Sequence, residues 1–174
     1  MRVIVFGAGT IGAVIARMLA DGGPYDVTVA DRDPAALARV PDFDTLAVDV
    51  AALPDVTAAA RGHDVVVSAC PYFVNPPIAR AAASVGAHYF DLTEDVATTR
   101  AVRELADGAA TAFVPQCGLA PGFIGIAAHA LAQRFERLRE VRMRVGALPR
   151  YPGNGLKYAL TWSTDGLINE YCNP

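Results

Sequence analysis

The stretch RVIVFGAGTIGAVIARMLA, residues 2–20, decides the fold. Residues 2–6 are a short β-branched run, and the apolar residues over 10–21 recur with helical spacing, so we expect a strand followed by a helix. The expected apolar stripe of this helix consists of Ile11, Val14, Ile15, Met18 and Leu19. The strand and the helix are joined by a GxGxxG sequence, Gly7-Ala8-Gly9-Thr10-Ile11-Gly12. Such a sequence is weak evidence alone, but between a strand and a helix it predicts a dinucleotide-binding turn.

Each glycine of this turn has a physical role. Gly7 permits a tight bend, Gly9 lets the backbone approach a pyrophosphate, and Gly12 lets the helix pack against the strand. The start of the helix presents N–H groups and a partial positive charge to the phosphates. We therefore expect the whole turn, residues 7–12, to contact the cofactor.

An acidic residue stands where the second strand is expected to end. That strand is DVTVAD (26–31), so its last residue is Asp31, about 20 residues beyond the glycines. The Asp31 carboxylate can accept hydrogen bonds from both hydroxyls of an adenosine ribose, and it repels a 2′-phosphate. This predicts NAD as the cofactor. Arg32 follows directly and can hold a 2′-phosphate, which leaves NADP open.

The pattern downstream alternates apolar runs with alanine-rich helical segments, which is typical of βαβ units on a parallel sheet. Pro34 marks a possible helix start. Further strands are expected at 45–50, 64–69, 87–92 and 111–116, and helices at 52–61, 75–86 and 94–107. The predicted fold is α/β, a Rossmann-type doubly wound parallel sheet formed by a dinucleotide-binding domain of residues 1–122.

The periodicity changes after Gly122. One more helix is expected at 123–134, followed by polar and apolar alternation over 138–148 and 156–163, which predicts two antiparallel strands, and by a helix beginning at 165–171. We interpret 123–174 as the incomplete start of a second α+β domain. Two strands cannot bury their own apolar face, so we expect a second copy of the chain to cover it in a homodimer. The residues of that face are Val141, Met143, Val145, Leu160 and Trp162.

Composition excludes several classes of partner. The chain has 174 residues with 15 Lys+Arg and 18 Asp+Glu, a net charge of −3, which lacks the basic footprint of a nucleic-acid-binding protein. No Lys/Arg cluster or long apolar run predicts membrane contact, and the apolar start is too short for a signal peptide. The 3 cysteines have no CxxC spacing, which favours a reducing, cytoplasmic location. The 3 histidines have no ligand spacing, so no metal is expected.

Several segments beyond the glycine turn are more specific. The segments DVVVSACPYFVNPPIARAAASVGAHYFDLTED (64–95), VPQCGLAPGF (114–123) and LKYALTWSTDGLINEY (156–171) resemble the saccharopine dehydrogenase family. The last of them is most similar to its lysine 6-dehydrogenase branch. The resemblance implies a Rossmann domain that binds NAD(P) and a second domain that covers the substrate. It also implies hydride transfer from an amine-bearing carbon of a lysine-derived or polyamine substrate, followed by hydrolysis of the imine.

The resemblance places further cofactor contacts after the third and fourth strands. Asp49 lies near the adenine by family position, or it caps the following helix. Ala69, Cys70 and Pro71 pass the nicotinamide ribose, with Cys70 as a small buried residue rather than a reactive thiol. Tyr72 either orients the substrate or packs against its neighbour, Phe73.

The candidate catalytic residues are Tyr72, Asp91 and Cys117. Asp91 can balance a substrate ammonium or act as a base. For Glu94 and Asp95 we favour a structural role at the positive end of a helix capped by Thr93. Cys117 opens CGLAPG (117–122), which resembles the family's GLxPG turn. Cys117 either touches the substrate or the nicotinamide, or it only shapes this tight bend between domains.

Lys157, the single lysine, either binds a substrate carboxylate or lies solvated on a strand face, and we favour the solvated position. Two functions remain open at this point. One is an NAD(P)-dependent dehydrogenase acting on amines, or the cofactor-binding portion of one. The other is a non-catalytic NAD-binding module or subunit. The DLTED and CGLAPG segments favour the enzyme, although we expect these 174 residues alone to turn over no amine.

Overall fold

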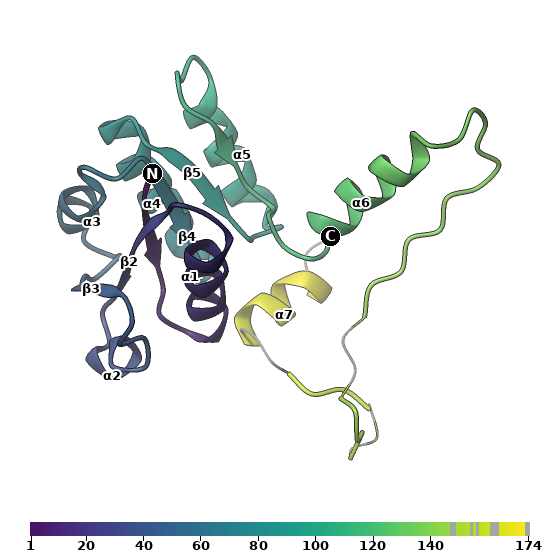
Figure 1. The fold of residues 1–174 in the computed structure, drawn as a ribbon, viewed down its shortest axis with the longest axis horizontal. Coiled ribbons are helices and arrows are strands. Elements are labelled where there is room, and N and C mark those ends of the chain that lie inside the picture. The colour runs from purple at the N-terminus through teal and green to yellow at the C-terminus, as the bar shows by residue number, and fades with distance from the viewer. Residues whose placement is uncertain (147–148, 154, 156, 161–163, 173–174) are drawn as a thin grey trace.

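A computed structural model describes residues 1–146, 149–153, 155, 157–160 and 164–172 (Figure 1). Its centre is a 6-stranded sheet in the order β3-β2-β1-β4-β5-β6, and every neighbouring pair is parallel. The strands are β1 (Arg2–Phe6), β2 (Asp26–Asp31), β3 (Asp44–Ala47), β4 (Val65–Ser68), β5 (His88–Asp91) and β6 (Phe113–Val114). This strand order confirms the Rossmann-type sheet that the sequence predicts.

Helices connect consecutive strands and cover both faces of the sheet (Figure 1). The connecting helices are α1 (Thr10–Gly22), α2 (Pro34–Leu37), α3 (Leu53–Ala60), α4 (Asn75–Val85) and α5 (Val96–Ala106), with a 3-10 turn, η1 (Tyr72–Val74), before α4. α4 packs between α3 and α5. Each predicted helix and strand of this domain is present, with ends shifted by a few residues, as in the shorter β3.

Two hydrophobic cores form, one on each face. In β1, Ile4 and Phe6 join the core beneath α3, α4 and α5, whereas Val3 and Val5 join the core that includes residues of α1 and α2. Successive side chains of a strand point to opposite faces, so a strand covered on both faces needs apolar residues at every position. This explains the continuous apolar runs of β1 and β4.

The buried face of α1 differs from the predicted stripe. Its fully buried residues are Gly12 and Ala16. Three residues of the expected stripe are instead exposed, by 42%, 51% and 69%: Ile11, Val14 and Met18. The reason is the close approach of Gly12 to the preceding turn, which fixes the rotation of α1 and turns its small residues inward.

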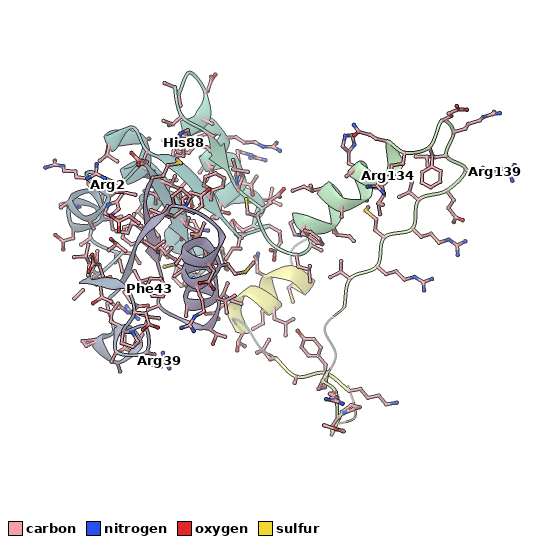
Figure 2. All side chains as sticks on the ribbon, viewed as in Figure 1. Arg2, Arg39, Phe43, His88, Arg134 and Arg139 are labelled. Carbon is pink, nitrogen blue, oxygen red and sulfur yellow. The ribbon has the colours of Figure 1, made fainter. Side chains whose placement is uncertain are left out.

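The sheet is followed by α6 (Phe123–Ala132), a long connection, and α7 (Thr164–Cys172). The predicted strands at 138–148 and 156–163 are wrong for the residues described there, since 138–146 and 157–160 contain no strand. Residues 147–148, 156 and 161–163, with Trp162, lie outside the described residues. Figure 2 shows Arg139 far from the sheet on this connection. A strand needs a neighbour for its backbone hydrogen bonds, and the described part of the chain places none beside it.

In the described part of the chain, the helices are too short or too polar to span a bilayer. Residues 141, 143 and 145 expose their apolar side chains by 54%, 56% and 45%.

Candidate functional site

The turn between β1 and α1 can be built only with glycine at two positions. Gly7 has φ 104°, and its N–H donates to the Ala30 carbonyl at 2.7 Å. A Cβ on Gly7 would lie 2.9 Å from the Ala69 carbonyl oxygen, and a Cβ on Gly12 would overlap the Gly7 carbonyl oxygen. The left-handed φ and these close contacts explain both glycines. They bring β1, β4 and α1 together at one point.

Gly9 is different, because a Cβ there would meet nothing within 4 Å. It is exposed and stands directly before α1, whose first turn receives no hydrogen bond from a capping side chain. Thr10, the first residue of α1, is exposed as well. The N-terminal N–H groups of this 13-residue helix therefore have no capping side chain and lie next to a residue without a side chain. An anionic phosphate group fits such a place.

Asp31 joins the end of β2 to this turn. Its Oδ2 accepts a hydrogen bond from the Ala8 N–H at 2.7 Å, and its Oδ1 accepts one from the Asp33 N–H at 2.9 Å. The side chain is half-buried, and the neighbouring Arg32 is exposed. The acid predicted to bind the ribose therefore lies within hydrogen-bonding distance of the turn predicted to bind the phosphates.

Asp49 is exposed two residues beyond the end of β3, and its Oδ1 accepts from the Ala51 N–H at 3.0 Å. The residue that precedes α3 is Ala52, so the alternative of Asp49 as the helix cap is wrong. The carboxylate closes the turn that leads into the helix.

The segment after β4 runs beside the glycine turn. The Ala69 N–H donates to the Phe6 carbonyl at 2.8 Å, which holds this segment against β1. Burial raises the pKa of the Cys70 thiol to about 12, so Cys70 is a neutral thiol at pH 7 rather than a nucleophile. Two residues before Cys70, the buried Ser68 hydroxyl donates to Asn75 Oδ1 at 2.7 Å. The sequence reasoning missed this pair, although a polar residue ending an apolar strand was a usable signal.

Pro71 is exposed and precedes η1. Tyr72 packs edge-to-face on Phe73, with ring centroids 5.6 Å apart and an interplanar angle of 81°. The Thr98 hydroxyl donates to the Tyr72 carbonyl at 3.3 Å and ties η1 to α5. The contact with Phe73, one of the two alternatives for Tyr72, is therefore present, and Tyr72 is half-buried.

Asp91, at the end of β5, is only 1% exposed. Its Oδ2 accepts from the Tyr89 hydroxyl at 2.9 Å, and its Oδ1 accepts from the N–H groups of Thr93 at 3.0 Å and Gln116 at 3.3 Å. Its carbonyl accepts from the Cys117 N–H at 2.8 Å. Burial raises the pKa of Asp91, and these hydrogen bonds oppose the shift. Asp91 thus holds the loops after β5 and β6 together.

Tyr89 and Gln116 are partners of Asp91 that the sequence reasoning missed. Burial and the adjacent Asp91 raise the pKa of the Tyr89 phenol, so Tyr89 is a neutral donor. The spacing of Tyr89 and Asp91, two residues apart on one strand, was the available signal, because such residues share a face. No sequence signal indicated Gln116, which lies 25 residues from Asp91.

Cys117 is exposed on the CGLAPG turn, with its Sγ 3.2 Å from the Val114 carbonyl oxygen. Burial of the sulfur and the nearby Asp91 raise the pKa of this thiol. The turn is tight, as expected: Gly118 and Gly122 form a bridge, and Gly122 has φ 128° with no room for a Cβ.

Two smaller predictions need correction. The residue that caps α5 is Asp95, whose Oδ1 accepts from the Thr98 N–H at 2.7 Å, whereas Thr93 Oγ1 accepts from the Asp95 N–H. Lys157 is exposed as expected, but it has φ 53° and lies in no strand. Among the described residues, no three His, Cys, Asp or Glu side chains gather as metal ligands.

Comparison with known proteins identifies the family of this site. The family model described as the saccharopine dehydrogenase NADP binding domain matches residues 3–114. The chain belongs to the saccharopine dehydrogenase family. Its NAD(P)-binding domain therefore has the sheet, the glycine turn and the acidic strand end described above.

Solved structures share the fold of this saccharopine dehydrogenase family member. Saccharopine dehydrogenase (L-Glu forming) from Saccharomyces cerevisiae has a TM-score of 0.73 and 22% identity, over 96% of this chain and 40% of the yeast chain. GenD2 from gentamicin A biosynthesis, in complex with NAD, has a TM-score of 0.56 and 23% identity, over 76% of this chain and 38% of GenD2. An oxidoreductase from Agrobacterium radiobacter, in complex with NAD+, L-tartaric acid and magnesium, has a TM-score of 0.59 and 16% identity. The match covers 76% of this chain and 40% of the Agrobacterium chain. The chain thus spans less than half the length of these proteins.

The residues present fit a dinucleotide. The open space at Gly9, the uncapped start of α1 and the half-buried Asp31 carboxylate supply, in chain order, a place for phosphates and an acceptor for ribose hydroxyls. The residues on either side of Gly9 are the small Ala8 and Thr10.

Proposed function

We propose that this protein is an NAD(P)-dependent oxidoreductase, or the cofactor-binding portion of one, that acts on a carbon–nitrogen bond of a lysine-like amino acid. Family membership supports the oxidoreductase class. The single observation that carries the cofactor assignment is the Asp31–Ala8 hydrogen bond beside the open space at Gly9. It brings a ribose acceptor and a phosphate turn together in one site.

The proposed cofactor contacts are those of the turn and of three strand ends. They are Gly7, Ala8, Gly9, Thr10, Ile11, Gly12, Asp31, Arg32, Asp49, Ala69, Cys70 and Pro71. We expect NAD to be preferred to NADP, because the Asp31 carboxylate repels a 2′-phosphate. Arg32 is exposed one residue further and offers NADP only a solvated partner.

Bound NAD(P) supplies the chemistry of accepting a hydride from the carbon that bears the amine, and water then hydrolyses the imine. The chain's own residues position the substrate. Tyr72, fixed through its carbonyl to Thr98, orients the substrate beside the end of β4. Cys117 is exposed on its tight turn and touches the substrate as a neutral thiol.

Asp91 is 1% exposed and both its oxygens accept hydrogen bonds, so we assign it a positioning role. It places the Gln116–Cys117 backbone, and through that backbone it sets where the Cys117 side chain lies. Such positioning matters because a misplacement of about 1 Å at a reacting group can cost a hundredfold in rate.

The finer assignments are proposals of the same kind. We propose a boundary at residue 122 between the dinucleotide-binding domain and the start of a substrate domain, a homodimer, and a cytoplasmic location. The exposed apolar residues Val141, Met143 and Val145 support the homodimer, since such residues favour burial against a second copy. Light scattering at several concentrations checks the oligomeric state.

The test is a calorimetric titration of the chain with NAD and with NADP, followed by NADH fluorescence with L-lysine and with L-norleucine, which lacks the side-chain amine. We expect NAD to bind more tightly than NADP and L-lysine alone to perturb bound NADH. Absence of cofactor binding contradicts the oxidoreductase assignment. Cofactor binding that no amine perturbs favours a non-catalytic NAD-binding module. Steady NADH production from NAD and L-lysine would contradict our expectation that this chain alone is inactive.

A further inference from the structure

A cleft of about 440 Å³ lies between η1 and α7, outside the glycine turn. It is lined by Tyr72, Phe73, Asp165, Ile168, Asn169 and Cys172. A volume of this order suits a small organic molecule. The wall from η1 begins at Tyr72, two residues after Cys70 and four residues after the end of β4. β4 and β1 flank the point where the strand order reverses, which is where open α/β sheets bind ligands.

We propose that this cleft binds the protonated amine of an organic substrate, a primary ammonium on a short apolar stem. The proposal rests on the proposed function and deepens it, because it assigns the amine-recognising residues. It adds α7 to the site, with Asp165 as the residue that binds the ammonium.

The wall from α7 is one face of a helix. Asp165, Ile168, Asn169 and Cys172 stand at positions i, i+3, i+4 and i+7, which lie along one side of an α-helix. This face therefore presents one carboxylate, one amide, one apolar side chain and one thiol to the cleft. Asp165 is in the first turn of α7, where the positive end of the helix favours a carboxylate.

The charge of the lining selects a cation. Asp165 is the one carboxylate among the six lining residues, and none of the six is Lys, Arg or His. An anion would therefore meet the Asp165 carboxylate and no cationic side chain, whereas an ammonium gains a charge-assisted hydrogen bond. Asn169 and Tyr72 add neutral oxygen acceptors for the remaining N–H groups.

The aromatic wall favours an organic cation. Tyr72 and Phe73 meet at an interplanar angle of 81°, so their ring faces point in different directions, and Phe73 is 57% exposed. Ring faces attract cations, and the edges and Ile168 pack against an alkyl stem. The Thr98–Tyr72 hydrogen bond holds this wall in place.

The lining fits a metal ion poorly. A divalent metal needs several oxygen, nitrogen or sulfur ligands, and tight sites use more than one anionic or imidazole ligand, whereas this cleft offers one carboxylate, one thiol and the neutral oxygens of Asn169 and Tyr72. The part of the chain that the structure describes also has no cluster of three such side chains. An alkylammonium needs only one anionic partner and an apolar surface, and the cleft supplies both.

The test uses calorimetry on the 174-residue chain, with and without saturating NADH, titrated with n-pentylammonium or with 1-pentanol as its uncharged counterpart. We expect n-pentylammonium to bind more tightly than 1-pentanol, and Asp165→Asn to weaken n-pentylammonium binding about fivefold, as for an exposed ion pair. The matched control is Asp55→Asn, which removes a carboxylate from the first turn of α3 and should change nothing. Phe73→Leu should weaken n-pentylammonium more than 1-pentanol, because it removes a ring face but retains an apolar side chain.

Equal binding of n-pentylammonium and 1-pentanol would overturn the proposal, as would an Asp165→Asn effect no larger than that of Asp55→Asn. Such a result with normal NADH binding leaves the oxidoreductase assignment standing. Conversely, if the chain binds n-pentylammonium in a way that depends on Asp165 but binds no NADH, the proposed ammonium site is supported and the oxidoreductase assignment is contradicted. Failure of the two proposals is therefore distinguishable.

Discussion

At the carboxyl ends of the strands, the sheet carries one acidic residue that is partly exposed and another that is buried among protein hydrogen-bond donors. Beside β1 and β2, a Cβ on Gly9 would meet nothing within 4 Å, and Asp31 is only half-buried, with each of its two oxygens accepting a single backbone N–H. Beside β5 and β6, Asp91 is 1% exposed, and its oxygens accept from a phenol and two backbone N–H groups. Both sides use a carboxylate that ends a strand. The first leaves room for a ligand, whereas the second is completed by protein, so residue type and strand position do not distinguish a binding acid from a structural one.

The largest expected effect comes from Gly12→Val. Its Cβ would overlap the Gly7 carbonyl oxygen, so we expect the free energy of unfolding to fall by about 3 kcal/mol or more. Gly9→Val is the matched control, because its Cβ enters open space. We expect it to leave the free energy of unfolding within about 0.5 kcal/mol and to abolish NADH binding. Urea unfolding followed by circular dichroism, with NADH fluorescence, measures both. An equal fall in the free energy of unfolding for Gly12→Val and Gly9→Val would contradict the distinction between Gly12, which has no room for a Cβ, and Gly9, which has.

Asp91→Ala is expected to cost about 3 kcal/mol of stability, because it leaves the Tyr89 hydroxyl and two N–H groups without their acceptor in a buried place. Tyr89→Phe removes a single hydrogen bond and should cost about 1–2 kcal/mol. Urea denaturation of both variants provides the measurement. If Asp91→Ala instead retained full stability, Asp91 would not have the structural role that distinguishes it from Asp31.

Asp31→Ala is expected to act on both folding and binding, because the buried Ala8 N–H loses its acceptor, at a cost of about 1–3 kcal/mol of stability. It removes the proposed ribose acceptor and should weaken NAD roughly ten- to a hundredfold, with a smaller loss for NADP because repulsion of the 2′-phosphate also disappears. Asp33→Ala is the control. It removes the cap of α2 and should cost about 1 kcal/mol of stability without changing the NAD preference. Calorimetry with both cofactors tests this, and equal affinities in the unmutated chain would contradict the assignment.

The sheet and the open side of its edge were predictable because their determinants are local. Three glycines, a β-branched run and an acid at the end of a strand are contiguous or regularly spaced in the sequence. The rotation of α1 was not predictable from its apolar spacing, since the contact of Gly12 with Gly7 overrides the larger side chains. The partners of Asp91 were equally hidden, because Gln116 reaches it only through the pairing of β5 with β6.

The alternation over 138–148 failed for a different reason. Val141, Met143 and Val145 alternate with arginines and a glutamate as in a half-buried strand, yet the described residues 138–146 form none. An alternating pattern specifies which face is apolar, but a strand also needs a neighbour for its backbone groups. In β1 that neighbour is present on both sides, in β2 and β4.

The smallest expected effect is the pH dependence contributed by Asp91. Burial raises its pKa in the folded chain above that of the unfolded chain, so the folded state binds the proton more readily. The contribution of Asp91 to stability is therefore largest below the unfolded pKa of about 3.9 and declines as the pH rises through the folded pKa. Asp91→Asn cannot ionise, so the stability difference between the unmutated chain and this variant should shrink across that window and then stay constant. Urea unfolding from pH 3.5 to 8, with Asp55→Asn as the exposed control, measures this difference. A stability difference that instead grows with pH would mean that the hydrogen bonds from Thr93 and Gln116 lower the pKa of Asp91 by more than burial raises it. The site beside β5 and β6 would then favour a charged carboxylate, as the site beside β1 and β2 is proposed to do.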